Sequence, residues 1–307
     1  MFDQTLAPSL SVAGALLFTT GIARVDATVI LDDVFADASR TETNLPTESA
    51  VWASHSDGVT MSAGSLSFDQ TASSGSQKLW THFAPDGSPV TLGVGQQLRA
   101  TIEFTPRTGL YDNSSRSFRF GLFHDPTDGQ VMEDTNDDGG GAGDPWTDSG
   151  GYGVQIALST GATSSANANV GKRTDLANNS LMGSSGAWTF ESGGDPIVNS
   201  LDALYTMVLE LDRTAVDQMM VTFSISDAGG LISTHTITDD PNGSGAFGTD
   251  PIATQFDHLF FRFSNNTTTA DELDFSRFAV EYIPEPSGAL MLGLAGMLML
   301  GRRGRRS

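Results

Sequence analysis

The sequence has 307 residues, of which 38% are hydrophobic and 17% charged, and its 37 acidic and 16 basic residues give a formal net charge of −21. This composition supports a folded core, and the acidity excludes a general nucleic-acid binder because phosphate contacts need a basic surface. The absence of cysteine excludes disulfides, thiolate metal sites and cysteine nucleophiles.

The first segment of the chain predicts export. Residues 10–18 form a short apolar run, and Val25 and Ala27 place small residues at positions −3 and −1 of a secretory cleavage site. We therefore expect residues 1–27 to be a signal peptide. Residues 1–9 contain no lysine or arginine, so either the start codon is misassigned or the signal is atypical. The alternative is that residues 10–18 form a buried strand or helix.

Residues 28–282 predict an all-β domain. Short stretches of alternating apolar and polar residues are separated by turn-forming residues, which is typical of strands, and no stretch predicts a helix. The expected strands are 28–35, 59–68, 78–83, 97–105, 117–124, 153–158, 205–212, 219–227, 231–238, 256–264 and 274–282. Apolar faces such as Phe118, Phe120 and Leu122 need a partner sheet, so we predict an antiparallel β-sandwich or jelly roll.

The strand count, the length and the dense final strands 256–282 give this body a resemblance to the concanavalin A-like lectin and glucanase superfamily, including laminin-G-like modules of bacterial surface proteins. The resemblance implies a lectin-like sandwich. A shared fold does not determine a shared function.

The loop 133–152 contains a candidate calcium site. Its start matches the first half of the D-x-[DN]-x-[DN]-G calcium loop, in which alternate oxygen ligands surround a hard cation. The twelfth position is Pro145 instead of glutamate, and we expect no flanking helices. The four candidate ligands for Ca²⁺ are Asp134, Asn136, Asp138 and Asp144. The alternative is a solvated, acidic, glycine-rich surface loop.

Two tryptophans are candidates for stacking on sugar rings. Trp146 and Trp188 lie in polar surroundings rich in glycine and serine, which makes them the better candidates for exposure among the four tryptophans, and they could stack on sugar rings if exposed. The alternative is that they belong to the core, as large aromatic side chains usually do.

A hydrolase is a further alternative. Laminarinase-type enzymes on this fold use an E-x-D-x-x-E strand motif, whose alternating carboxylates flank one glycosidic bond. Glu272 and Asp274 match its first two positions, but Arg277 stands at the position of the acid. The five histidines show no short metal-ligand spacing. We therefore predict no catalytic residues and no enzymatic activity.

Residues 283–307 predict a tail in three parts. Pro284, Glu285 and Pro286 precede an apolar run at 288–301, which predicts a single hydrophobic helix shorter than the about 20 residues of a stable span. Arginines at the end favour the cytoplasmic side, so the chain before them would lie outside. These arginines are Arg302, Arg303, Arg305 and Arg306.

This order of elements resembles the PEP-CTERM sorting signal of Gram-negative and related bacteria. The resemblance implies that Pro284, Glu285 and Pro286 are recognised by an exosortase-type membrane peptidase, that 288–301 is a transient membrane segment, and that the arginines stop transfer. The alternative is an ordinary tail anchor.

Together these features predict an exported protein of the cell surface or extracellular matrix, whose lectin-like body binds or organises extracellular polysaccharide. The alternatives are a purely structural surface protein without a ligand, and a glycan-active hydrolase.

Overall fold

The computed structural model describes most of the chain between residues 26 and 285. The described ranges are 26–54, 56–72, 76–109, 118–127, 129–135, 146–158, 167–178, 181–182, 185–243, 245–263 and 271–285. Residues 1–25 and 286–307 lie outside them, and with them most of the expected signal peptide and the expected hydrophobic helix. Among the described residues, no helix is both long and apolar enough to cross a membrane.

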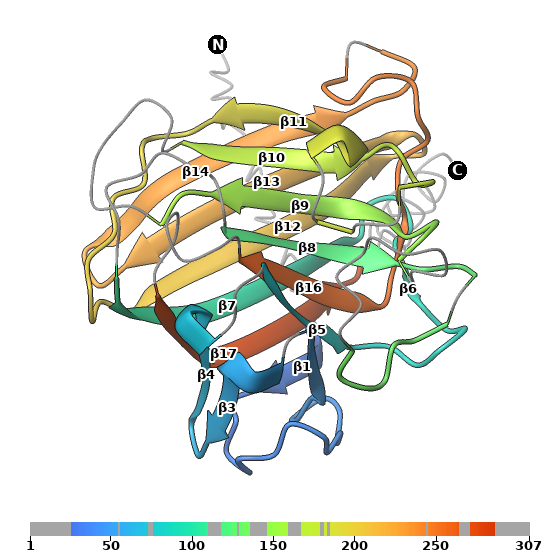
Figure 1. The fold of residues 1–307 in the computed structure, drawn as a ribbon. Coiled ribbons are helices and arrows are strands. Elements are labelled where there is room, and N and C mark those ends of the chain that lie inside the picture. Colours follow the sequence, from blue (N-terminus) through green and yellow to red (C-terminus); the bar gives the residue numbers. More distant parts are fainter. Residues whose placement is uncertain are drawn as a thin grey trace, which may run out of the picture. The chain divides into compact units, whose positions relative to one another are not determined.

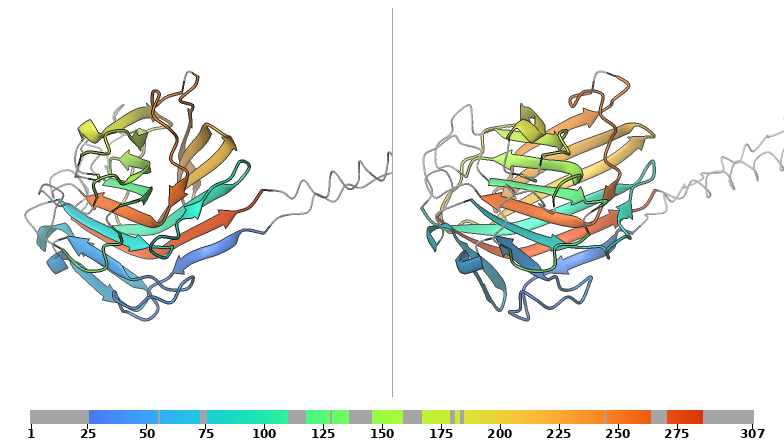
Figure 2. Two further views of the ribbon diagram at one scale, coloured as in Figure 1. Left: turned by 90° about the vertical axis from the view of Figure 1, so that its right-hand side faces the viewer. Right: turned by 45° about the vertical axis from the view of Figure 1, so that its right-hand side comes forward.

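The described strands form two antiparallel sheets that face each other as two layers (Figures 1 and 2). Sheet A has the order β14-β13-β12-β7-β17-β4-β3, with β1 also paired to β17. Its strands are β1 (Thr28–Asp33), β3 (Val59–Ser62), β4 (Ser65–Asp69), β7 (Gln97–Thr108), β12 (Tyr205–Ala215), β13 (Gln218–Asp227), β14 (Gly230–Asp239) and β17 (Glu272–Ile283).

Sheet B has the order β11-β10-β9-β8-β16-β5-β2. Its strands are β2 (Val51–Ser54), β5 (Gln77–His82), β8 (Phe118–His124), β9 (Gly150–Ile156), β10 (Ala168–Arg173), β11 (Trp188–Gly193) and β16 (His258–Phe263). A small pair joins β6 (Val90–Thr91) and β15 (Gln255–Phe256). The helical content of the described ranges is three short 3₁₀ turns at Ser56–Gly58, Gln70–Ala72 and Ser185–Ala187. The predicted all-β antiparallel sandwich is confirmed.

The main core lies between the sheets. In β7 the residues alternate between half-buried and fully buried positions, and Leu98, Ala100, Ile102 and Phe104 face inward with no exposed surface. Burial of the larger side chains Leu98, Ile102 and Phe104 contributes about 1.5–3 kcal/mol each. Because the other face of sheet A stays partly exposed, its strands show the alternation that the sequence displays.

A second buried cluster covers the face of sheet B that points away from sheet A, hereafter the outer face of sheet B. Side chains from connecting segments pack there on those of the strands, so all six residues of β5 and all six of β10 are buried. The cluster consists of Ala50, Trp52, Trp80, Phe123, Trp146, Leu181, Met182, Ala187, Trp188 and Phe260. Sheet B is therefore buried on both faces.

The sequence-based strands differ from the structure in two ways. The stretch 59–68 is a hairpin, because Gly64 adopts a positive φ of 85° and turns the chain between β3 and β4. Strands β2, β6, β10 and β11 were not predicted. In β10 the buried polar side chains of Lys172 and Arg173 interrupt the apolar pattern that identifies a strand.

A buried ion pair links the two sheets. Nζ of Lys172 on β10 lies 2.8 Å from Oδ2 of Asp239 on β14, and the hydroxyl of Tyr152 donates to the same oxygen at 2.6 Å. Burial, followed by the charge of Asp239, raises the pKa of Tyr152 well above its usual value. The lysine charge is therefore compensated inside the sandwich, as a buried charge requires.

Candidate functional site

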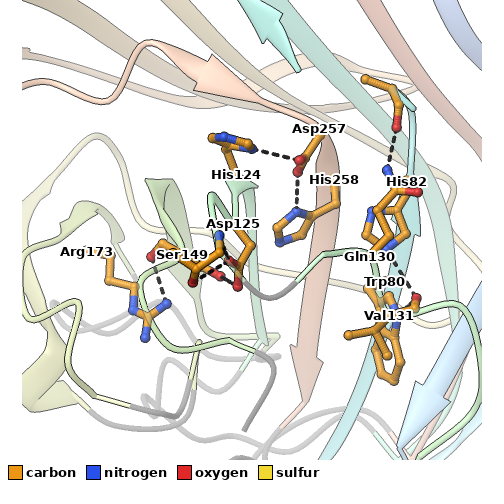
Figure 3. Close-up of polar contacts among 12 residues, drawn as sticks. Trp80, His82, His124, Asp125, Gln130, Val131, Ser149, Arg173, Asp257 and His258 are labelled. Atoms are coloured by element: carbon orange, nitrogen blue, oxygen red, sulfur yellow. Dashed lines mark hydrogen bonds and ion pairs between the residues drawn. The ribbon is translucent and has the colours of Figure 1, made fainter. Parts of the chain in front are cut away.

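Three histidines that are far apart in the sequence lie close together at one end of sheet B, where His82 and His258 are on the outer face and His124 joins them through Asp257 (Figure 3). His124 ends β8, His258 begins β16 and His82 ends β5, and these strands are neighbours in the sheet. His258 stands directly opposite His82 in the register of β16 and β5. Directly opposed residues of an antiparallel pair have their Cβ atoms only about 4.5–5.5 Å apart, which brings the two rings together.

Asp257, just before β16, accepts hydrogen bonds from two of these histidines. Its Oδ1 lies 2.6 Å from Nδ1 of His258, and its Oδ2 lies 2.7 Å from Nδ1 of His124. Burial acts to raise the pKa of Asp257, but the hydrogen bonds and charges of His258 and His124 outweigh burial and lower it. The ionised carboxylate only accepts, so both imidazoles carry their proton on Nδ1 toward Asp257.

His82 has the opposite tautomer. Its Nε2 lies 3.2 Å from the carbonyl oxygen of Val131, which also accepts a 3.1 Å hydrogen bond from the indole of Trp80. A carbonyl cannot donate, so the proton of His82 sits on Nε2. Burial, followed by the proximity of His258, lowers the pKa of His82 to about 3. His82 is therefore neutral at physiological pH.

Two ring nitrogens in this group are left without a hydrogen bond. Within the described part of the chain, Nδ1 of His82 and Nε2 of His258 are buried and have no hydrogen-bond partner. The two ring centroids are 5.4 Å apart. His82, Asp257 and His258 each offer a ligand atom within 4.8 Å of the others, so these three residues could hold a metal ion.

Aromatic rings surround the histidines and continue across the sheet. The ring of Trp52 lies 5.8 Å from that of His82, and the ring of Trp146 lies 5.5 Å from that of His258. Trp52, Trp80 and Phe260 occupy successive register positions of β2, β5 and β16, and we call them the aromatic row.

Glycines extend the aromatic row over β8, β9 and β10. Gly121, Gly153 and Gly171 stand in successive register positions beside Phe260. A Cβ atom on Gly153 would lie 2.9 Å from Cε of Met182 and 3.1 Å from the ring of Trp188. The missing side chains therefore leave the space that Met182 and Trp188 fill.

A row of polar side chains runs beside the aromatic row. Each of its members is two residues away from a member of the aromatic row or of its glycine extension on the same strand, so both rows lie on the same face of the sheet. Arg262 and Arg119 are half-buried neighbours in register, and both donate from Nη1 to the carbonyl oxygen of Met182, at 3.2 and 2.5 Å. Burial, followed by the charge of Arg262, lowers the pKa of Arg119 to about 10. The polar row consists of Lys78, Arg262, Arg119, Gln155 and Asn169.

The calcium candidates lie largely outside the described residues. Asn136, Asp138 and Asp144 belong to the undescribed range 136–145. Asp134 is described, and its carboxylate accepts two hydrogen bonds from the guanidinium of Arg40, at 3.0 and 2.6 Å, and one from the amide of Ala53 at 2.9 Å. An ion bound there would share Asp134 with an arginine.

The two tryptophans that were candidates for stacking on sugar rings lie in the core instead, as the alternative held. Trp146 is 2% exposed and Trp188 is 6% exposed, and both belong to the cluster on the outer face of sheet B. The indole of Trp188 donates to the carbonyl oxygen of Leu181 at 2.9 Å, which holds it against the sheet. Polar neighbours in the sequence suggested exposure, but Trp188 fills the space beside Gly153. The ring of Trp146 packs against those of Trp80, His258 and Phe260.

The remaining candidates lie elsewhere. Glu272 and Asp274 are on β17 of sheet A, where Asp274 forms a 2.6 Å ion pair with Arg107. Of the expected sorting motif, Pro284 and Glu285 are described, whereas Pro286 and the terminal arginines are not.

Sequence spacing missed the histidine group because strand pairing, and not a short motif, brings its members together. A local signal existed. His82 and His124 end dense hydrophobic strands, His258 begins one, and two of the three have an adjacent aspartate.

No protein-family model and no curated protein sequence matches this chain. Its structural neighbours include legume lectins and other concanavalin A-like sandwiches. Peanut lectin with a nine-residue peptide has a TM-score of 0.45 and 12% identity, covering 84% of this chain and 97% of the lectin. An endo-1,3-beta-glucanase from Streptomyces sioyaensis has a TM-score of 0.45 and 12% identity, covering 88% and 99%. The exoplasmic/lumenal domain of VIP36, in a Ca²⁺- and mannose-bound form, has a TM-score of 0.48 and 8% identity, covering 83% and 91%.

Proposed function

We propose that this chain is an exported, non-enzymatic protein of the bacterial surface or matrix, whose body binds anionic exopolysaccharide along the outer face of sheet B. The observation that carries the proposal is the pair of half-buried guanidinium groups of Arg119 and Arg262 in the polar row, which lies beside the aromatic row on one face of one sheet. The other members of the row, Lys78, Gln155 and Asn169, are buried beside them. Aromatic walls with a few well-placed polar groups are typical of ligand sites.

The chemistry of the polar row favours a carboxylate-bearing sugar polymer. The guanidinium group binds carboxylates through paired hydrogen bonds, and amide side chains both donate to and accept from hydroxyl groups. Arg119 and Arg262 provide two adjacent guanidinium groups, and Gln155 follows in register.

The distribution of charge supports the same conclusion. Apart from the four arginines of the tail, the chain has 16 − 4 = 12 basic residues, and three of these lie in the polar row. The rest of a chain with a net charge of −21 repels a polyanion, so the polymer would approach this row in preference to other surfaces.

The proposal is tested by affinity electrophoresis of the full-length chain in gels that contain a polyuronate or a neutral β-glucan. We expect the polyuronate to retard the wild type, and the double variant Arg119→Gln/Arg262→Gln to lose at least tenfold in affinity. The matched control is Arg99→Gln, on the opposite face of the sandwich, which should bind as the wild type does. Retardation by neither polymer would instead support a purely structural surface protein.

Export and sorting form a second part of the proposal. Pro284, Glu285 and Pro286, with the apolar run and arginines that follow, fit recognition by an exosortase-type peptidase, after which the body would reach the surface. The test is mass spectrometry of the chain from a host that carries such a peptidase. We expect a C-terminus near the motif in the wild type, and an intact, membrane-associated chain for Pro284→Ala/Pro286→Ala. An unprocessed wild type would instead support an ordinary tail anchor.

The calcium site is a third part. Asp134, Asn136, Asp138 and Asp144 would bind Ca²⁺ and so order the loop that carries them. We expect the thermal unfolding midpoint to rise with calcium relative to chelator, and Asp138→Asn to remove the difference. Identical midpoints in calcium and chelator would exclude this site.

A further inference from the structure

We propose that His82, Asp257 and His258 form a binding site for one divalent transition metal ion such as Zn²⁺. The three residues offer ligand atoms within 4.8 Å of one another. They come from adjacent strands that hold them in fixed register, since His258 opposes His82 and Asp257 directly precedes His258.

The proton of His82 is placed as a metal ligand needs it. A metal-bound histidine usually donates its other N–H to a carbonyl or carboxylate oxygen, which fixes the tautomer and the ring orientation. His82 donates from Nε2 to the carbonyl of Val131, and its Nδ1 carries a lone pair and has no hydrogen-bond partner among the described residues. Nδ1 of His258 lies 2.6 Å from Oδ1 of Asp257, and an ion bound by both atoms would displace the proton between them.

Burial makes the lone pair of His82 informative. His82 is 7% exposed, Asp257 4% and His258 1%, so water does not freely replace a missing partner. A buried polar atom that lacks its hydrogen bond needs an explanation, and a bound ion supplies one here because two further ligand groups lie beside it. The rings of Trp52 and Trp146 pack against the two histidines and shield the group further.

The kinds of ligand atom at this site determine which class of metal ion it would bind. Imidazole nitrogen suits Zn²⁺, Cu²⁺, Fe²⁺ and Ni²⁺, whereas Ca²⁺ and Mg²⁺ prefer oxygen ligands alone. His124 donates to Oδ2 of Asp257 at 2.7 Å, so it is a positioning residue that orients the carboxylate without contacting the ion.

This site is independent of the proposed polysaccharide function. The polymer would use the polar row, whereas the ion would sit among the histidines at one end of β5 and β16. A result against polysaccharide binding therefore leaves the test of metal binding intact, and the reverse also holds.

The experiment uses the full-length chain, freed of metal by a chelator and then loaded with Zn²⁺ or Co²⁺. We expect one ion per chain by elemental analysis, a higher thermal unfolding midpoint with Zn²⁺ but not with Mg²⁺, and visible absorption bands of nitrogen-ligated Co²⁺. The absence of stoichiometric metal together with an unchanged midpoint in the wild type would overturn the proposal.

Variants locate the site. His82→Gln and His258→Gln should each abolish stoichiometric binding, and His124→Gln should weaken it by about 10–100-fold, as outer partners of metal ligands do. The matched control His235→Gln, on β14 of sheet A, should bind as the wild type does. Circular dichroism establishes that each variant is folded. Full binding by folded His82→Gln would overturn the proposal, and the Co²⁺ spectrum of the wild type tests imidazole ligation even where a variant fails to fold.

Discussion

The outward surfaces of the two sheets differ sharply. On sheet A this surface is half-exposed and carries ion pairs such as Arg99 with Glu210, at 2.7 Å, and Arg277 with Asp32, at 2.6 Å. On sheet B it is largely covered by connecting segments, with Arg119 and Arg262 half-buried, and it carries all four tryptophans of the chain. One sandwich thus uses one sheet as an ordinary solvated surface and the other as the floor of a candidate site.

The outward surface of sheet A has the character of a solvated surface even where it is concave. A shallow hollow of about 320 Å³ there is lined by charged and small polar side chains that include Arg99, Glu210 and Ser224. Its arginines already pair with carboxylates across neighbouring strands. Exposed pairs of this kind contribute little to stability, so the hollow has the character of a solvated face.

The largest expected difference between the two surfaces concerns large aromatic side chains. Trp80 on sheet B is 1% exposed, and truncation of such a ring typically costs about 3–5 kcal/mol. We therefore expect Trp80→Ala to lower the free energy of unfolding by that amount in urea titrations. Thr222→Ala on sheet A should change it by less than about 0.5 kcal/mol. Equal effects would contradict the contrast between the surfaces.

A smaller effect should follow from filling the glycine positions. In Gly153→Ala the new methyl group would lie 2.8 Å from the carbonyl oxygen of Phe120 and 2.9 Å from Cε of Met182. Overpacking of this kind costs about 1–3 kcal/mol. The change should also alter the fluorescence of Trp188, which packs against the same glycine. Ser224→Ala on sheet A is the matched control, and unchanged stability and fluorescence in Gly153→Ala would refute the packing described above.

The smallest effect belongs to the ion pairs of sheet A. Arg99 and Glu210 have side chains that are 36% and 27% exposed, so Arg99→Gln should cost no more than about 1 kcal/mol. The difference should fall further as salt is added, because mobile ions screen exposed charges. A larger, salt-independent loss of unfolding free energy would mean that this surface is less solvated than its exposure indicates.

The same contrast explains what the sequence could predict. Strands of sheet A such as β7 and β13 have one buried and one half-exposed face, so their alternating pattern identified them. Strand β10 of sheet B is buried on both faces, and its Lys172 and Arg173 gave no such pattern.

The candidate site was harder to predict for a related reason. The sequence contains His82 and His258, but only the register between β5 and β16 makes them neighbours. Likewise, the burial of Trp146 and Trp188 depends on packing against the covered face, of which the residues beside them in the sequence give no sign.

The most direct test of the account uses the tryptophans, because all four lie on the outer face of sheet B and report on it alone. The full-length chain is titrated with polyuronate while intrinsic fluorescence is recorded. We predict a saturable change in the wild type and in Arg99→Gln, and none in Arg119→Gln/Arg262→Gln. Polyuronate binding that leaves the fluorescence unchanged, or that Arg99→Gln abolishes, would contradict the assignment of function to this face.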